Sequence, residues 1–307
     1  MFIAVLDFGT NTFNLLIAEK KLHGFEILYS GKEGVKLGRS GIQKRIITGE
    51  AMERGFSAIE KHLETIRKYG AHEVYAFATS AIRSAVNGNE FVRKAEQRFG
   101  FSVQVINGDR EAELIYKGVR QAVSFTANNT MILDIGGGSV EFIICKSDNL
   151  FWKHSFDIGM ARVLEQFDLS DPVTDEDIES LERFFETELH LLFDMVNRFH
   201  PEMLIGASGT FDTLRSLIMH KKVLRDNDRP GIEITMQDYG MIHRELLLST
   251  LEKRKVMPGM EPVRVEMIVP ATIFVNFIIH SCGIKRLYQS SYALKEGVMA
   301  EMVELQN

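Results

Sequence analysis

The chain has 307 residues, a hydrophobic content of 45%, a charged content of 25% and a formal net charge of -6. This length exceeds the usual size of one domain and predicts two domains with separate cores. The acidic balance argues against broad nucleic-acid binding and against long-range steering of a polyanion, so a phosphate-rich substrate would need local basic residues or a bound cation.

The N-terminal segment and the apolar runs predict a cytoplasmic protein. The first residues contain no basic region, and Asp7 interrupts the apolar run, so they do not resemble a signal peptide. The longest apolar stretch, from Ile268 to Ile279, is too short for a membrane span. Cys145 and Cys282 lie in no CxxC or Cys/His cluster, which predicts two buried free thiols rather than a zinc site or a disulfide.

The opening segment is echoed later in the chain. Residues 5–16 read VLDFGTNTFNLL, and residues 132–143 read ILDIGGGSVEFI. Each copy has Asp, an apolar residue, Gly, two small or polar residues and a hydroxyl between two apolar runs, which predicts a strand, a tight turn and a second strand. The two copies indicate two structurally similar halves.

Between the copies, helical and strand patterns alternate. Apolar residues at helical spacing precede Gly70, which is typical of a helix end. Such an alternation predicts an α/β fold with helices on the faces of a sheet. The expected elements are a helix at 52–69, a strand at 73–78, a short helix at 88–98, a strand at 101–106 and a helix from about 107.

The second half repeats this theme. Thr174, with Asp177 three residues later, is expected to cap a helix that runs unbroken to Pro201. A strand at 203–207 then enters a turn at Ser208–Thr210.

No flexible linker separates the halves. We place the domain boundary near residue 120, which gives one domain of residues 1–120 and a second of residues 121–307. A helix at about 292–307 could pack back on the first domain. The hinge is expected to consist of packed elements.

Both echoed turns are candidates for binding phosphate. Glycine lets backbone N–H groups approach phosphate oxygens, because no Cβ blocks the approach. The segment Asp134–Ser139 meets this requirement, and two opposed turns would grip a phosphate chain from both sides. Neither turn has the spacing of a P-loop.

The acids of these turns are candidate metal ligands. Asp7, Asp134 and Glu141 supply the hard oxygen donors that Mg²⁺ takes beside phosphate oxygens and water. The alternatives are that Asp134 only forms its turn and that Glu141 is a solvated strand residue.

Two further segments carry polar groups directly after predicted strands. In ATSAIR, the hydroxyls and Arg83 would lie at the carboxyl end of a strand, and arginine offers a fork of donors to phosphate. In NGDREAE, a carboxylate at the start of a helix could hold a water for in-line attack. Ordinary helix capping and helix-dipole interactions are the alternatives for both segments.

The order and spacing of these motifs resemble the exopolyphosphatase/guanosine pentaphosphate phosphohydrolase family, within the actin, sugar kinase and Hsp70 ATPase superfamily. The resemblance implies two actin-like (ribonuclease H-like) domains with the active site in the cleft between them. It runs nearly end to end, through DFGTNTFNLLI, ATSAIRSAVN, INGDREAELIYKGV, LDIGGGSVEFII, IGASGTFDTL, VRVEMIVPA and YALKEGVM.

The resemblance also implies roles for individual residues. Glu111 takes the place of the catalytic base of the family, and Arg83 that of its phosphate-binding arginine. Asp134 and Glu141 match its metal-site acids. The matching phosphate-binding positions are Asp7, Gly9, Thr10, Asn11, Thr79, Ser80, Gly136, Gly137, Gly138, Ser139, Gly209 and Thr210.

Three positions depart from the pattern of the family. Val140 stands where Thr or Ser is common, and Ser291 and Lys295 stand where Asp and Arg are common. We expect the last two to change details of the domain interface rather than the chemistry.

The chain also ends before the C-terminal helical domains that longer members use to hold polyphosphate. A basic stretch from Lys32 to Arg45 could guide an anionic chain, or it could be a solvated loop, and it is too small to track many phosphates. We therefore expect a preference for short polyphosphates or nucleotide-borne phosphates, with release between cuts.

Together these observations predict Mg²⁺-dependent hydrolysis of a terminal phosphoanhydride of inorganic polyphosphate or guanosine pentaphosphate, with water activated by Glu111. Two alternatives stay open, an ATP-dependent small-molecule kinase of the same superfamily and a non-catalytic binder of guanosine tetra- or pentaphosphate. The expected partner is the substrate, with neither nucleic acid nor membrane, and the formation of a homodimer stays open.

Overall fold

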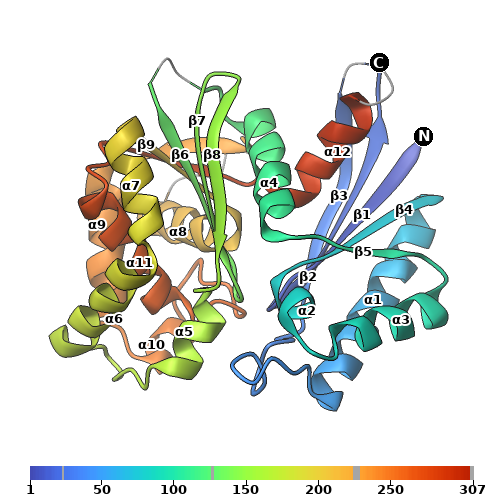
Figure 1. Ribbon diagram of the computed structural model, residues 1–307, viewed down its shortest axis with the longest axis horizontal. Helices are drawn as coiled ribbons and strands as arrows, with labels where there is room; N and C mark the ends of the chain where they lie inside the picture. The colour runs from blue at the N-terminus through green and yellow to red at the C-terminus, as the bar shows by residue number, and fades with distance from the viewer. Residues whose placement is uncertain (23, 126–127, 224–228, 305–307) are drawn as a thin grey trace.

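The computed structural model describes residues 1–22, 24–125, 128–223 and 229–304, which form two α/β units side by side (Figure 1). The sheet of the first unit consists of β1 (Phe2–Phe8), β2 (Thr12–Lys20), β3 (Phe25–Gly34), β4 (Glu73–Ala78) and β5 (Val103–Val105), in the order β3-β2-β1-β4-β5. This sheet, with the helices described below, confirms the predicted α/β class.

The sheet of the second unit has a corresponding order. It consists of β6 (Thr130–Ile135), β7 (Val140–Lys146), β8 (Asn149–Phe156), β9 (Met203–Ala207), β10 (Gly231–Ile234) and β11 (Arg286–Ser290). The order is β10-β11-β9-β6-β7-β8. In both sheets an antiparallel three-strand meander is extended by two parallel strands on the side of its first strand, and the second sheet adds β10, which is antiparallel to β11.

The echo in the sequence is a structural repeat. Asp7 of β1 pairs with Asn14 of β2, and Asp134 of β6 pairs with Glu141 of β7. The turn that follows each Asp therefore occupies the same place in its unit, at the end of a central strand.

Helices cover the outer face of the first sheet. These are α1 (Gly49–Tyr69), α2 (Ser80–Ser84) and α3 (Gly88–Phe99). The helix α1 ends where its sequence predicts, because Gly70 adopts the left-handed conformation (φ 65°) in which glycine has no steric cost.

Seven helices belong to the second unit among the described residues: α5 (Met160–Gln166), α6 (Asp175–Glu188), α7 (His190–Phe199), α8 (Ser208–Lys221), α9 (Met236–Leu247), α10 (Leu251–Lys255) and α11 (Ile268–Ser281). The predicted capping box at Thr174 and Asp177 is present. None of the helices in the described ranges is both long and apolar enough to span a membrane.

Two predictions for this unit were wrong. The helix expected to continue to Pro201 is interrupted at Leu189, whose backbone leaves the helical region (φ −101°, ψ 16°). Phe185, Leu189 and Leu192, on the two sides of this break, belong to the same core. The turn expected at Ser208–Thr210 is instead the first turn of α8.

Two helices lie between the sheets, α4 (Gly108–Ala122) and α12 (Leu294–Glu304) (Figure 1). They bury the facing sides of both sheets in one apolar cluster. Where they cross, a Cβ on Gly118 would lie 1.9 Å from the carbonyl oxygen of Ala293, and one on Gly297 would lie 1.7 Å from that of Leu114. The helix near the C-terminus thus packs on α4 and the first sheet, and the boundary predicted near residue 120 falls at the end of α4.

Candidate active site

A cavity of about 360 Å³ lies between the two units, next to the repeated turns. It collects most of the residues singled out from the sequence: Asp7, Gly9, Thr10, Asn11, Thr79, Ser80, Glu111, Asp134, Gly136, Gly137, Gly138, Ser139, Glu141 and Gly209. Of the predicted positions, Arg83 and Thr210 are not among the described residues that line it. Thr210 is buried inside the first turn of α8.

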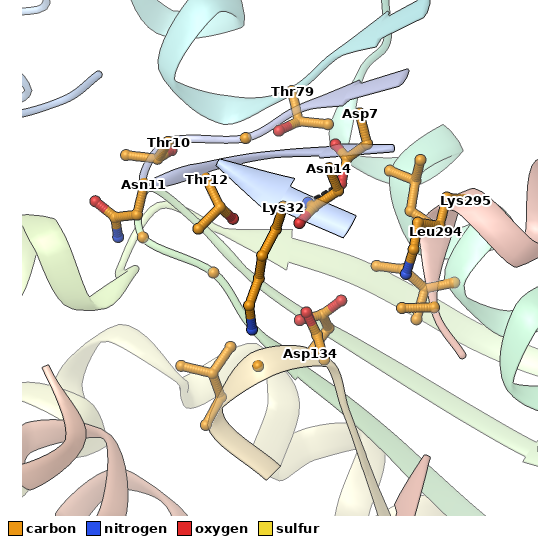
Figure 2. A pocket seen from close by; sticks show the side chains of 18 of the residues that line it. Asp7, Thr10, Asn11, Thr12, Asn14, Lys32, Thr79, Asp134, Leu294 and Lys295 are labelled. Carbon is orange, nitrogen blue, oxygen red and sulfur yellow. Dashed lines mark hydrogen bonds between the residues drawn. The ribbon is translucent and has the colours of Figure 1, made fainter. Parts of the chain in front are cut away.

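The repeat places Asp7 and Asp134 on opposite sides of the cavity (Figure 2). The carboxylates of Asp7 and Glu141 are each held by a hydrogen bond from a neighbouring strand. Asn14 Nδ2 donates to Asp7 Oδ2 at 2.8 Å, and Ser155 Oγ of β8 donates to Glu141 Oε1 at 2.7 Å. The two copies therefore present the same scaffold with different charge, an acid and an amide in the first unit and two acids in the second.

The glycine loop (residues 136–139) is oriented by the start of α5. A planar trans peptide unit points its carbonyl and the following N–H in opposite directions. The N–H groups of residues 137–139 therefore point away from α5, and these residues line the cavity. The bonds that turn the carbonyls toward α5 are Met160 N–Gly136 O at 3.0 Å, Ala161 N–Gly137 O at 2.8 Å and Arg162 Nε–Gly138 O at 2.7 Å.

Gly159 permits this contact between the loop and α5. A Cβ there would lie 2.4 Å from the carbonyl carbon and 2.5 Å from the carbonyl oxygen of Gly137. Any side chain at this position would therefore push the glycine loop away from the helix.

The two phosphate-loop candidates touch each other across the cavity. A Cβ on Gly137 would lie 2.1 Å from Asn11 Nδ2, and one on Gly138 would lie 2.5 Å from Ser80 Oγ and 2.6 Å from Thr10 Oγ1. The absence of side chains in the glycine loop lets polar groups of the first unit approach its backbone. Ser80 Oγ is buried and has no hydrogen-bond partner among the described residues.

Glu111 enters the cavity from the first turn of α4. The side chain of Asn107 caps this helix by accepting from the N–H of Arg110, as expected for a helix that begins directly after a strand. Glu111 Oε2 accepts from Arg83 Nη1 at 2.7 Å, and the same nitrogen donates to the carbonyl of Ile106 at 3.1 Å. Arg83 therefore reaches the site through Glu111.

Burial and mutual repulsion disfavour ionisation of the site acids. Burial raises the pKa of Asp7 to about 6, that of Asp134 to about 8 and that of Glu141 to about 7. Burial and the charge of Glu141 raise the pKa of Glu111 well above its usual value, while Arg83 partly opposes this shift. Asp212, a fifth acid lining the cavity, has its pKa raised by burial as well. The cavity thus holds more acidic groups than its own cations can keep ionised.

Sequence reasoning assigned no role to Arg264, which the structure places in the cavity wall. This residue is 9% exposed, and its Nε has no hydrogen-bond partner among the residues that the structure describes. The absence of a side chain at Gly209 makes room for it, because a Cβ there would lie 2.0 Å from Arg264 Nη2. Arg254 fixes the neighbouring backbone by donating from Nε to the carbonyl of Val265 at 3.0 Å. A buried guanidinium with an open donor is suited to an anion.

Lys295 is a second cation that sequence reasoning placed only at the domain interface. It lines the cavity together with Ser291, so these two departures from the family pattern lie beside the site acids. Lys295 Nζ pairs with Glu296 at 2.9 Å, and its charge also lowers the pKa of Asp7 and Asp212. Lys32, which extends into the cavity from β3, forms an ion pair with Glu261 of the second unit (Figure 2).

The acids of the cavity suit a divalent cation that also binds substrate. In the described ranges, no group of three or more His, Cys, Asp or Glu side chains is arranged to hold a metal ion on its own. Mg²⁺ commonly binds through one or two carboxylates and completes its shell with water and phosphate oxygens. Asp134 and Glu141, which face each other across β6 and β7, meet that requirement.

The repeated α/β units around an acidic cavity are those of the two-domain actin-like fold that the resemblance implied. A model of the Ppx/GppA phosphatase family matches residues 16–306, so the chain belongs to that family and is a phosphatase.

Solved structures agree with this assignment. An exopolyphosphatase from Cytophaga hutchinsonii is 35% identical, with 99% of this chain and 98% of that chain covered and a TM-score of 0.95. The PPX-GPPA enzyme from Aquifex aeolicus is 24% identical, with 98% of this chain and 99% of that chain covered and a TM-score of 0.80, and it shows the same fold.

Proposed function

We propose that this phosphatase hydrolyses the terminal phosphoanhydride of inorganic polyphosphate or of guanosine pentaphosphate, with Mg²⁺ as cofactor. The observation that carries the proposal is the composition of the cavity. Peptide groups of the glycine loop and the guanidinium of Arg264 line the same cavity as five acids, of which Glu111, Asp134 and Glu141 are buried. Donors of this kind bind phosphate oxygens, whereas the acids can bind a cation and activate water.

Glu111 is the proposed general base. Burial and Glu141 raise its pKa, so its carboxylate is a stronger base than a solvent-exposed glutamate, and Arg83 holds it in place. The water oxygen attacks the terminal phosphorus as Glu111 takes up a proton. The bond from phosphorus to the bridging oxygen breaks, and the shortened chain leaves with the bonding electrons on that oxygen.

The remaining groups stabilise the charge that develops on the transferred phosphoryl group. Peptide N–H groups of residues 137–139 and the guanidinium of Arg264 would bind its non-bridging oxygens. Bound Mg²⁺, held by Asp134 and Glu141, would neutralise negative charge on the phosphates. Lys295 would limit the repulsion between Asp7 and the substrate.

Phosphate release measured over a substrate panel tests this proposal. The panel contains short and long polyphosphates, guanosine pentaphosphate, ATP and pyrophosphate, each with and without Mg²⁺. We expect Mg²⁺-dependent release from polyphosphate or guanosine pentaphosphate, with ATP and pyrophosphate as poorer substrates. Phosphorylation of a second substrate by ATP, without free phosphate, would support a kinase instead. Tight binding of guanosine pentaphosphate in Mg²⁺ with no turnover would support a non-catalytic regulator.

A further inference from the structure

Arg162 connects the glycine loop to the opposite unit. This residue lies in the first turn of α5, and its side chain is 11% exposed. Its Nε donates to the carbonyl of Gly138 at 2.7 Å, within the second unit. Its Nη2 donates to Ser84 Oγ at 3.1 Å, and its Nη1 donates to the carbonyl of Ile42 at 3.4 Å, both in the first unit.

The contact with Ser84 leads to other residues of the site. Ser84 is the last residue of α2, the helix that also carries Ser80 of the cavity wall and Arg83, the partner of Glu111. One guanidinium therefore joins the third carbonyl of the glycine loop to the short helix whose Arg83 binds the proposed base, Glu111 of α4.

Gln43 of the first unit forms two further hydrogen bonds with α5. Gln43 Nε2 donates to the carbonyl of Arg162 at 3.1 Å, and the backbone N–H of Gln43 donates to Glu165 Oε2 at 3.3 Å. The segment 38–47 of the first unit is thus bound to α5 through side-chain and backbone groups. These bonds require the two units to be close together, since each joins a residue of the first unit to one of the second.

The other two loop carbonyls are bound by backbone N–H groups of α5, which any residue except proline could provide. The carbonyl of Gly138 depends instead on a side chain, and only a planar fork of donors can bind it and two groups of the other unit at once.

We propose that Arg162 is a positioning residue that sets the orientation of the Gly138–Ser139 peptide and couples it to closure of the two units. The N–H of Ser139 points toward the cavity because the carbonyl of Gly138 is held on the other side. Without Arg162 this peptide can rotate, and the N–H of Ser139 then no longer points at the charge that develops on the phosphoryl group. The effect on catalysis rests on the proposed function, whereas the effect on loop order does not.

The test compares Arg162→Met, Arg162→Lys and Ser84→Ala with Arg183→Met, an exposed arginine on α6 that serves as a matched control. We expect Arg162→Met to lower kcat on the best substrate by on the order of 10–100-fold with a smaller change in KM, because the lost donor acts on the transition state. Arg162→Lys should recover only part of this loss, since a single ammonium cannot make all three contacts.

Ser84→Ala removes only the contact with the first unit. We expect it to lower kcat less than Arg162→Met, and the double variant to be no worse than Arg162→Met alone, because the two residues act through one hydrogen bond. Additive losses would contradict the coupling.

Hydrogen exchange supplies the readout that is independent of activity. Amides of residues 136–139 and 38–47 should exchange faster in Arg162→Met but not in Arg183→Met. If exchange rises as expected while the wild-type protein releases phosphate from no substrate, the proposed function fails and the positioning role stands. A lower Tm with unchanged kcat and unchanged exchange in both segments would overturn the role of Arg162, and Arg162→Lys provides the same comparison should the methionine variant not fold.

Discussion

Asp134 shows how the chemistry of the site opposes the stability of the fold. Burial, followed by the charges of Glu111 and Asp7, raises its pKa from 3.8 to about 8. A carboxyl with a raised pKa keeps its proton in the folded state at a pH where the unfolded chain has lost it. Folding therefore takes up protons between about pH 4 and pH 8, and the free energy of unfolding falls as pH rises across that window.

The first prediction is that Asp134→Asn stabilises the metal-free protein at pH 8. The amide cannot ionise, so the cost of ionising Asp134 disappears, and the gain should vanish as pH approaches 4. Thermal unfolding in EDTA across this pH range measures it. A gain of about 1 kcal/mol would raise Tm by about 2–4 °C in a large domain. A Tm below wild type at every pH would contradict the electrostatic account of Asp134.

The second prediction concerns Mg²⁺. Asp134→Asn removes one hard ligand or an acceptor for metal-bound water, so activation should require a higher Mg²⁺ concentration. Titration of phosphate release with Mg²⁺, and calorimetric titration of the metal into protein with a substrate analogue, measure the shift. An unchanged titration curve for the variant would exclude a metal role for Asp134.

At the scale of elements, the glycine loop and α5 act as one unit. The loop has the right composition to bind phosphate, but its orientation comes from a helix that begins some twenty residues later in the chain. The contact requires a glycine at position 159, where no Cβ fits.

The third prediction compares two glycine substitutions. Gly159→Ala should destabilise the protein by about 1–3 kcal/mol through overpacking and lower kcat, because the new methyl group displaces the glycine loop. Gly240→Ala, within α9 where a Cβ meets nothing within 4 Å, should instead stabilise by about 0.5–1 kcal/mol with unchanged activity. Denaturant unfolding and phosphate release measure both variants. Equal effects of the two would show that the contact at position 159 does not set the loop.

Some features of these elements could be predicted from the sequence, and others could not. The strand–turn–strand repeats and the cap at Thr174 depend on neighbours in the chain, so local patterns were enough to find them. Arg264 and Lys295 reach the cavity only through tertiary packing, from segments more than 120 residues beyond the glycine loop. The break at Leu189 could not be predicted, because the helical spacing of the apolar residues continues across it.

At the scale of the whole molecule, the two units meet along α4 and α12 and across the cavity. The helix crossing relies on Gly118 and Gly297, while ion pairs of Lys32 with Glu261 and of Lys36 with Glu266 join the units beside the site. The cavity that remains, of about 360 Å³, is at the small end of ligand sites and suits a short terminal segment of a phosphate chain.

The fourth prediction follows from this small cavity and from the net charge of -6, which gives little long-range attraction for a polyanion. A long polyphosphate should be released between cuts. Gel analysis during digestion should show a gradual downward shift of the whole population. Full-length chains that persist beside free phosphate, with no intermediates, would mean processive hydrolysis and would contradict this prediction.

The central claim is that Glu111, buried beside the glycine loop, is the base that activates water, and kcat of Glu111→Gln tests it most directly. Glutamine keeps an oxygen that can accept the hydrogen bond from Arg83, so folding should be preserved, which circular dichroism and Tm will verify. Loss of a general base typically lowers the rate on the order of 10²–10⁴-fold. The account predicts a decrease in kcat within that range on the best substrate of the panel. A folded variant whose kcat falls by less than about tenfold would show that Glu111 is not the base.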